Sequence, residues 1–347
     1  MEKLYCRRIF PCLALIRIPY LSLGGETAFT NVYLIIDKEL VLIDAGPWRN
    51  FYFDILSSSL DQLGLSVRDI SRIIYTHAHP DHMGGGIELN KHQEFSHSIY
   101  WEAQKQVEKY GHYATRVKSI SKEIFFNHLS LYPAEKDIYS NVIDSFWRPT
   151  CGEIKIVHSL YDGEIVSTGK LKFEVVFTPG HSPWDISLWE EKTAMLFSGD
   201  FLLRKSTTLT GGLKGFGSDL KAYESSLQKI GKYLAKAKCV FPSHGPSIMS
   251  CSNLADDLSR TIKWREHRIL QGLSNKSQRT DLMNTLLSSN QGPLALVRQL
   301  GVTLTHLEKL EKEGRVIRSH DREEILYELP QKQISGQLNT TQRRQCL

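Results

Sequence analysis

The sequence predicts an α/β fold that carries a metal site at the ends of its strands. Apolar runs typical of buried strands occur at residues 14–18, 32–36 and 40–43. A helical stretch at residues 51–63 then leads into another apolar run at 73–75. Several of the apolar runs in the chain are followed directly by residues able to bind a metal ion. This combination indicates a sheet whose loops converge on one functional edge.

The first metal-binding candidate is the segment that follows residues 73–75. It reads Thr76-His77-Ala78-His79-Pro80-Asp81-His82 and holds three imidazoles and one carboxylate. If these side chains were buried without a common purpose, each would need a hydrogen-bond partner of its own. Neutral imidazole and ionised carboxylate suit a borderline divalent ion such as zinc. The segment therefore predicts a metal cradle.

Three later apolar runs each end in one further metal-capable residue. Residues 171–178 lead into His181, residues 193–198 into Asp200, and residues 239–242 into His244. A lone histidine is more often a structural residue than a ligand, so each position alone is weak evidence. Their shared position after a strand predicts that all three complete the cradle.

In this order, these motifs resemble the ligand set of the metallo-β-lactamase superfamily. Asp44-Ala45-Gly46 and Thr178-Pro179-Gly180-His181 also fall where that superfamily has recurring turns. The resemblance implies an αββα sandwich with two bound cations. Together with the C-terminal winged-helix outline described below, it extends to superfamily hydrolases that carry a winged-helix tail, and it then covers about residues 10–330. It implies that one cation is held by His77, His79 and His181, that the other is held by Asp81, His82 and His244, and that Asp200 bridges them. Asp44 would either support the ligands or be an ordinary polar turn residue.

The chain departs from the superfamily pattern at one position. Many relatives carry another histidine four residues after the one that matches His181, whereas this chain has Asp185 there. The ligand set is complete without it. Asp185 would either orient a ligand or simply begin the following strand.

Two bound cations predict hydrolysis. A water molecule shared between them loses a proton near neutral pH, which supplies a hydroxide nucleophile without a catalytic serine or cysteine. Asp81 is the favoured proton shuttle, ahead of Asp200. Zinc is the expected metal, ahead of iron or manganese. A redox role is less favoured. Related enzymes with such a role hold a single iron with fewer ligands, whereas this chain has the ligands expected for both cations.

Composition predicts a soluble protein of the cytoplasm. The six cysteines have neither metal-ligand spacing nor a disulfide framework, which favours reduced thiols. The apolar stretch at residues 9–23 is interrupted by Pro11, Arg17 and Pro19, so an edge strand is expected rather than a signal peptide. No uncharged run is long enough to cross a bilayer.

The sequence divides into a catalytic domain at residues 1–250, a winged-helix-like domain at 251–330 and a disordered tail at 331–347. A helical insert at about residues 93–150 is expected within the catalytic domain, either as a lid over the substrate or as ordinary core packing. Its large apolar residues are Trp101, Tyr110, Tyr113, Phe125, Phe126, Leu129, Tyr132, Phe146 and Trp147.

The winged-helix outline rests on four helices and a hairpin. The expected helices are residues 253–273, 281–287, 294–300 and 303–313, the last of them ended by Gly314, and the expected hairpin joins residues 316–318 to 325–329. In the fourth helix Glu308, Glu311 and Glu313 outnumber Lys309 and Lys312, which would repel phosphates. The tail is therefore expected to be a structural or homodimerising module rather than a DNA reader.

Three functions remain open. The favoured one is hydrolysis of a small acyl substrate, namely a thioester, ester or lactone. The net charge is +5, and 15 Lys+Arg against 11 Asp+Glu fall from Cys251 onward, so the catalytic part is nearly neutral and lacks the basic groove of a nucleic-acid enzyme. The alternatives are a metal-dependent endoribonuclease acting on single-stranded RNA and a non-enzymatic regulator that senses a ligand or binds nucleic acid. Cleavage of β-lactams is not favoured, and no membrane partner is expected.

Overall fold

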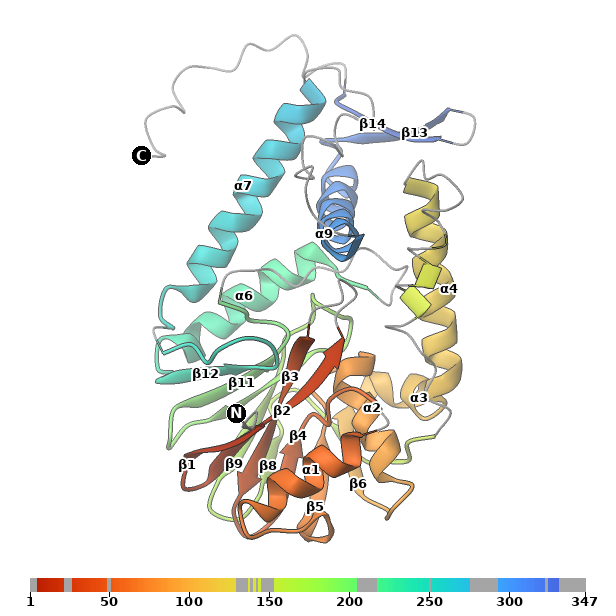
Figure 1. The fold of residues 1–347 in the computed structure, drawn as a ribbon. Helices are drawn as coiled ribbons and strands as arrows, with labels where there is room; N and C mark the ends of the chain where they lie inside the picture. The colour runs from red at the N-terminus through yellow and green to blue at the C-terminus, as the bar shows by residue number, and fades with distance from the viewer. Residues whose placement is uncertain are drawn as a thin grey trace.

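Two β-sheets lie face to face between layers of helices in the computed structural model (Figure 1). The structure describes residues 5–21, 27–48, 51–128, 137, 140–141, 143–144, 153–204, 217–249, 251–274, 293–321 and 324–330. Among these residues no helix combines the length and the apolarity that crossing a bilayer requires.

The first sheet has seven strands in the described part of the chain, ordered β1-β2-β3-β4-β5-β6-β7. These strands are β1 (Cys6–Phe10), β2 (Leu13–Leu21), β3 (Thr27–Ile36), β4 (Leu40–Ile43), β5 (Ile70–Ile74), β6 (Ser96–Tyr100) and β7 (Ile156–Leu160). Strands β1 to β4 pair antiparallel, whereas β4 to β7 pair parallel. The carboxyl ends of β4, β5, β6 and β7 therefore share one edge.

The second sheet has five strands among the described residues, ordered β12-β11-β10-β9-β8. These are β8 (Ile165–Ser167), β9 (Lys172–Phe177), β10 (Ile186–Glu190), β11 (Met195–Gly199) and β12 (Cys239–Pro242). Strand β12 pairs parallel to β11 and the other neighbours pair antiparallel. Strands β9, β11 and β12 match the predicted runs, and their carboxyl ends also share one edge.

The helices cover both outer faces of this pair of sheets. They are α1 (Tyr52–Asp61), α2 (Pro80–Leu89), α3 (Gln104–Val107), α4 (Tyr110–His128), α6 (Leu220–Leu234), α7 (Leu254–Ser274) and α9 (Pro293–Lys312), with short 3₁₀ turns at Val67–Asp69 and Trp101–Ala103. Helices α1 and α2 pack on the seven-stranded sheet. Helix α6 and the first half of α7 pack on the five-stranded sheet. The predicted αββα sandwich is thereby confirmed.

The apolar alternation of the strands explains the central layer. Tyr33, Ile43 and Ile74 point from the first sheet toward Phe173 and Phe197 of the second, and all five are buried. Residues of opposite parity, such as Leu42 and Ile73, face the outer helices. Strands buried on both faces read as nearly continuous apolar runs, which is why they are conspicuous in the sequence.

Three consecutive glycines in α2 let this helix approach the sheet closely. A Cβ atom on Gly85 would collide with the carbonyl oxygen of Ala45 and with the ring of Tyr52, and one on Gly86 would collide with the hydroxyl of Tyr75. Glycine costs a helix about 1 kcal/mol relative to alanine. The protein tolerates that cost here because only glycine permits the close approach of α2. Asp81 lies in the first turn of the same helix.

We expect Gly85→Ala to destabilise the fold by about 1–3 kcal/mol, because overpacking outweighs the gain in helix propensity. The matched control is Gly231→Ala in α6, where a Cβ atom would meet nothing within 4 Å. That change should stabilise the protein by up to about 1 kcal/mol. Urea unfolding of both variants gives the comparison, and equal stabilities would contradict the collision at Gly85.

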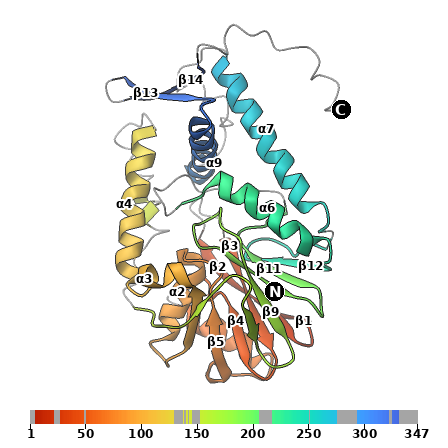
Figure 2. The same ribbon diagram turned by 180° about the vertical axis from the view of Figure 1, so that it is seen from behind.

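The C-terminal part begins with α7 as predicted and contains one correction. The segments expected as separate helices at residues 294–300 and 303–313 form the single helix α9. Leu300, Leu304 and Leu307 lie on one continuous buried face, so Gly301 does not interrupt the helix. The expected helix at 281–287 lies outside the described residues. Figures 1 and 2 show α7, α9 and α4 on the same side of the sandwich.

The end of α9 and the hairpin follow the prediction. Gly314 has a positive φ of 66°, and the N–H of Arg315 donates to the carbonyl of Leu310 at 2.9 Å, which closes the helix. Strands β13 (Ile317–Asp321) and β14 (Glu324–Glu328) pair antiparallel. The winged-helix assignment itself stays a prediction.

The predicted insert also needs a correction, because its first residues form strand β6 of the sheet. The sequence Ser96-His97-Ser98 reads as polar, yet His97 and Ser98 are buried beside β5. The helical part begins only at Trp101. Leu129, Tyr132, Phe146 and Trp147 lie outside the described residues, as does the side chain of Phe125.

Candidate metal centre

The structure brings all seven predicted ligand side chains to one edge of the sandwich. His77, His79, Asp81 and His82 come from the turn after β5 and the start of α2, and His181, Asp200 and His244 follow β9, β11 and β12 respectively. Six of these residues are buried, and His244 is the most exposed, with 19% of its side chain accessible. Seven donors from four loops therefore line one largely buried site.

Three histidines form the first group of the site. Nδ1 of His79 lies 3.0 Å from Nε2 of His77 and 3.0 Å from Nε2 of His181. Zn–N bonds of about 2.0–2.1 Å in a tetrahedral site place ligand nitrogens roughly 3.3 Å apart. The three nitrogens thus converge at nearly the spacing that a single cation requires.

The second group consists of Asp81, His82 and His244. Their ligand atoms also lie within 4.8 Å of one another. Nε2 of His244 lies 3.1 Å from Oδ2 of Asp81, and Nε2 of His82 lies 3.7 Å from Oδ1 of Asp81. Two imidazoles and one carboxylate form a donor set that suits a divalent cation.

Asp200 lies between the two groups. Its Oδ2 atom is 3.7 Å from Nε2 of His181 in the first group and 3.5 Å from Nε2 of His244 in the second. Its Oδ1 atom is 3.7 Å from Nε2 of His82. One carboxylate therefore faces both groups, which is the placement that the sequence predicts for a bridging ligand.

The site fits metal ions because it buries polar atoms that the protein leaves unsatisfied. Among the described residues, Oδ1 of Asp81 and Nε2 of His82 are buried and have no hydrogen-bond partner. Leaving such an atom unpaired costs about 1–3 kcal/mol, and more for a charged group. Both atoms point into the cluster of donors, where a cation would satisfy them.

The outer nitrogens of three histidines are held by oxygen atoms. Nδ1 of His82 lies 2.8 Å from Oδ2 of Asp44, Nδ1 of His77 lies 3.1 Å from Oγ1 of Thr76, and Nδ1 of His244 donates to the carbonyl of Phe29 at 3.0 Å. A histidine that donates from its outer nitrogen presents a lone pair on its inner nitrogen. This arrangement prepares His82 and His244 for coordination.

Asp44 is the central support of the site. Besides His82, its carboxylate accepts hydrogen bonds from the backbone N–H of Thr76 at 2.8 Å and from the hydroxyl of Ser243 at 2.9 Å. Its backbone has a φ of 59°, a conformation that few residues other than glycine, asparagine and aspartate adopt. The supporting role expected from the resemblance therefore describes its position better than that of an ordinary turn residue.

Burial and neighbouring charges shift the pKa values of the two histidine groups in opposite directions. Burial lowers the pKa of His79 to about 3 and that of His77 well below its ordinary value, so both stay neutral. Burial alone would raise the pKa of Asp81, but His82 and His244 hold it at about 2. Burial also lowers the pKa values of His82 and His244, but the nearby carboxylates outweigh it and raise both above the ordinary value. Because neutral imidazole and ionised carboxylate are the forms that bind metal, a cation bound at the second group would displace a proton from these two rings.

The sequence matches the model of the metallo-beta-lactamase superfamily over residues 25–244. This chain belongs to that superfamily. It is 27% identical to the "Beta-lactamase-like protein 2 homolog" of Caenorhabditis elegans, over 84% of this chain and 81% of the relative. It is 25% identical to the "Probable metallo-hydrolase YqjP" of Bacillus subtilis, over 87% and 92% of the two chains.

A more distant relative and a solved structure complete the comparison. The "Atrochrysone carboxyl ACP thioesterase" of Claviceps purpurea is 23% identical over 72% of this chain and 62% of its own length. The crystal structure of the metallo-beta-lactamase family protein TTHA1429 from Thermus thermophilus superposes with a TM-score of 0.72 at 22% identity, over 93% and 100% of the two chains. These findings identify this chain as a metallo-hydrolase of the metallo-β-lactamase superfamily, whose fold binds divalent metals.

Asp185, which replaces the histidine of many superfamily members, fixes the loop of His181. Its carboxylate accepts hydrogen bonds from the backbone N–H of Ser182 and from the hydroxyl of Ser182, the latter at 2.8 Å. Oδ1 of Asp185 also lies 4.0 Å from Nδ1 of His77. Strand β10 begins at the next residue. Burial raises the pKa of Asp185 to about 6.

Sequence analysis missed the residues that hold the ligand loops from behind. The hydroxyl of Tyr110 in α4 donates to the carbonyl of Ala78 at 3.0 Å, between His77 and His79. The hydroxyl of Ser226 in α6 donates to the carbonyl of Pro179 at 2.7 Å, and that of Tyr223 donates to the carbonyl of Phe201 at 2.7 Å. These residues act on backbone carbonyls, which leave no motif in the sequence.

Proposed function

We propose that this protein is a binuclear metal-dependent hydrolase of a small acyl substrate, with a thioester ahead of an ester or lactone. The observation that carries the proposal is the position of Asp200, whose carboxylate faces both groups of candidate ligands. When bound, two cations joined in this way would supply the Lewis acidity that activates water and polarises a carbonyl group near neutral pH. The first cation would be held by His77, His79 and His181, and the second by Asp81, His82 and His244.

The protein's own contribution to proton transfer is assigned to Asp81. Its Oδ2 atom is turned toward His244, while its buried Oδ1 atom has no hydrogen-bond partner among the described residues. A carboxylate has two oxygen atoms, so with one held by the second cation the other would accept a proton from the attacking water and return it to the leaving thiolate. The balanced reaction converts one thioester and one water into a carboxylic acid and a thiol.

The helical insert is further support for a small substrate. Its helix α4 begins in contact with the loops that carry the candidate metal ligands. Besides the bond from Tyr110 to Ala78, the ring of Tyr113 lies 6.2 Å from that of Trp184, next to Asp185. Both tyrosines are buried, so this part of the insert is packed core rather than an open surface. Rigid packing behind the metal loops favours a preformed site for a compact substrate.

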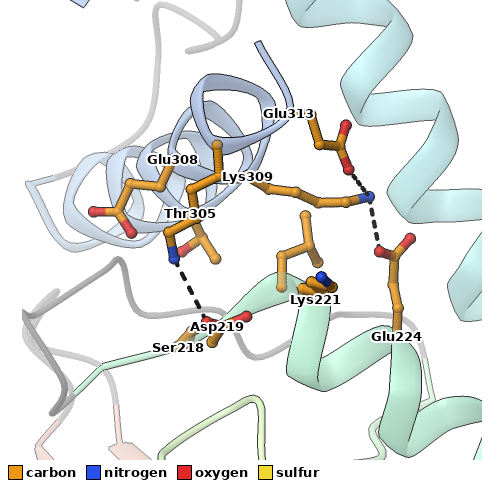
Figure 3. Close-up of a pocket in the computed structure, with 10 residues that line it drawn as sticks. Ser218, Asp219, Lys221, Glu224, Thr305, Glu308, Lys309 and Glu313 are labelled. Carbon is orange, nitrogen blue, oxygen red and sulfur yellow. Dashed lines mark ion pairs between the residues drawn. The ribbon is translucent and has the colours of Figure 1, made fainter. Parts of the chain in front are cut away.

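The charges on α9 also support an acyl substrate over nucleic acid. The ammonium group of Lys309 lies 2.7 Å from Glu224 of α6 and 2.6 Å from Glu266 of α7, and Lys312 faces Asp219 at 3.6 Å. Figure 3 shows Lys309 directed between Glu313 and Glu224, where α9 faces α6. A cavity of about 330 Å³ with mixed charge lies at this junction. Both lysines are therefore engaged by carboxylates, which disfavours phosphate contacts.

One of the relatives supports this choice. The Claviceps purpurea relative is by its name a thioesterase, which supports thioester hydrolysis here. The metal motif itself does not choose between a carbonyl and a phosphodiester, because activated water attacks either. The substrate must therefore be decided by experiment.

We expect metal-reconstituted protein to hydrolyse an acyl-thioester faster than a lactone and to leave single-stranded RNA intact. Asp81→Asn should lower kcat/KM for the thioester by about 10²- to 10⁴-fold, the usual contribution of general acid–base catalysis. RNA cleavage that Asp81→Asn abolishes, together with no turnover of any acyl substrate, would establish an endoribonuclease instead.

The same assay tests whether the exposed aromatic residue after β6 contacts the acyl group. Trp101 is 45% exposed and stacks on Tyr161 with ring centroids 6.1 Å apart. Since β6 runs parallel to β5, Trp101 lies at the edge of the sheet that carries the metal loops. Trp101→Ala should raise KM with little change in kcat. Trp264→Ala, which changes another exposed tryptophan on α7, is the control. Trp147, the other tryptophan of the predicted lid, lies outside the described residues.

A further inference from the structure

We propose that Asn31 is a positioning residue that holds His244 in place for the second cation. This inference rests on the binuclear site proposed above. It concerns a residue on strand β3 that is separated from His244 by most of the chain. It assigns Asn31 a specific task, which is to fix the loop that carries the most exposed of the candidate ligands.

Asn31 holds the main chain on both sides of His244. Its side-chain amide nitrogen donates to the carbonyl of Pro242 at 2.9 Å and to the carbonyl of Gly245 at 2.8 Å. Its backbone N–H donates to the carbonyl of Ser243 at 2.8 Å. Asn31 thus contacts three of the four residues from Pro242 to Gly245, and its side chain is buried.

The same strand holds the imidazole ring of His244. Nδ1 of His244 donates to the carbonyl of Phe29, two residues before Asn31. Strand β3 therefore fixes both the backbone and the ring orientation of one ligand. Fixing both removes the conformational freedom that the ligand would otherwise lose on binding a cation.

The loop depends on this support because its own backbone conformation is uncommon. Gly245 has a positive φ of 76°, and the following Pro246 has no N–H to donate. The loop is also attached to strand β11 of the five-stranded sheet, because the N–H of Ser243 donates to the carbonyl of Gly199 at 2.9 Å. Without the Asn31 amide, the Gly245 side of the loop loses the hydrogen bond that closes it over β3.

The effect of Asn31 is confined to the second group of ligands. Within the described part of the chain, its side-chain amide donates to Tyr33, Pro242 and Gly245, and its backbone N–H donates to Ser243. None of these residues belongs to the first group of candidate ligands. Removing a residue that orients a ligand typically weakens metal affinity by about 10- to 100-fold. Loss of the Asn31 amide should therefore weaken one cation and leave the other bound.

The test uses zinc binding by the full-length protein and compares three variants. Asn31→Ala removes the amide, and Asn31→Asp keeps the shape of the side chain but replaces the donating nitrogen with oxygen. Thr30→Val is the matched control, because Thr30 is equally buried in β3 and its hydroxyl has no hydrogen-bond partner among the described residues. Circular dichroism of each metal-free protein checks the fold.

Equilibrium dialysis at graded zinc concentrations gives the number and affinity of bound ions. We expect close to two zinc ions in the wild type and in Thr30→Val. In Asn31→Ala and Asn31→Asp one of the two ions should bind about 10- to 100-fold less tightly than in the wild type, with the other unchanged. A role in packing alone would leave Asn31→Asp like the wild type, which would overturn the proposal.

Two further outcomes separate this inference from the function on which it rests. Wild-type protein that binds two ions, alongside Asn31 variants that bind both with unaltered affinity, overturns the positioning role only. Wild-type protein that binds fewer than two ions overturns the binuclear site and the positioning role together. If Asn31→Ala does not fold, Asn31→Asp decides the question.

Discussion

Asp200→Ala should reduce the bound metal from close to two ions per chain to one or fewer, and should lower kcat/KM on the order of 10³-fold or more. Asp200 approaches His181 at 3.7 Å and His244 at 3.5 Å, so its removal affects both groups of ligands at once. It also removes a negative charge between two expected cations, which leaves their mutual repulsion unscreened. The loss of bound metal should therefore exceed that caused by removing a ligand that belongs to one group.

His79→Ala provides the comparison with a ligand of one group. Nδ1 of His79 lies 3.0 Å from a nitrogen of each of the two other histidines in the first group. Its removal should release the first cation and also abolish hydrolysis. The control is Asp257→Ala, which removes an exposed carboxylate of α7 that pairs with Arg260. Exposed ion pairs contribute little, so the control should stay near wild type.

Elemental analysis of the purified, metal-reconstituted protein gives the stoichiometry, and steady-state kinetics gives the activity. If the wild-type protein binds no transition metal, the proposed metal site is contradicted. Full activity in both Asp200→Ala and His79→Ala would contradict it equally.

The clustering of the seven candidate ligands could be predicted from sequence because their chemistry is concentrated. Four of the seven residues lie between positions 77 and 82, and the other three each follow an apolar run. Parallel strands end at one edge, so residues after them converge without any knowledge of distance. Asp44 could be placed only as one of two alternatives, because a turn aspartate and a ligand-supporting aspartate look alike in sequence.

The supporting residues could not be predicted, because their partners are backbone carbonyls far away in the chain. The two backbone carbonyls that accept hydrogen bonds from the Asn31 amide lie 211 and 214 positions later. The available signal was Asn31 itself, a polar residue directly before the apolar run at residues 32–36. A buried amide must find hydrogen-bond partners. Nothing in the sequence indicates which carbonyl it meets.

Two errors in the predicted secondary structure, at strand β6 and at helix α9, have the same physical cause. Strand β6 reads as polar, yet His97 is buried and its ring nitrogens face the hydroxyl of Tyr75 at 2.9 Å and the side-chain oxygen of Asn90 at 2.8 Å. Helix α9 contains Gly301 and yet continues, because the leucines on either side share one buried face. Tertiary contacts override local preference in both cases.

Deleting the chain from Asn253 onward should prevent the remaining residues from folding into soluble protein. Leu254, Leu258 and Ile262 of α7 are buried against α6, in the same cluster as Leu227 and Ile230. Burying each such side chain stabilises the fold by about 1.5–3 kcal/mol. Their combined loss is comparable to the whole net stability of a typical domain, which is about 5–15 kcal/mol.

The second half of α7 and helix α9 add to this effect. Ile269 and Leu273 join the cluster on the other side of the sandwich, together with Leu304 and Leu307 of α9. From sequence, Ile262, Trp264, Ile269 and Leu270 were all expected to become exposed by the cut. The structure buries Ile262 and Ile269, leaves Leu270 half-buried, and leaves Trp264 59% exposed. Trp264 does not contribute to the contact.

Three proteins decide whether the C-terminal part is integral to the fold. The chain cut at Asn253 should aggregate, because removing α7 uncovers the apolar face of α6. Deletion of Gln331–Leu347 should leave solubility and Tm unchanged, since that segment is polar and low in apolar residues. Trp264→Ala should change the free energy of unfolding by less than about 0.5 kcal/mol. Soluble expression, size-exclusion chromatography and thermal unfolding provide the measurements. A monomeric fragment of residues 1–252 with wild-type Tm and bound metal would show that the sandwich folds without α7.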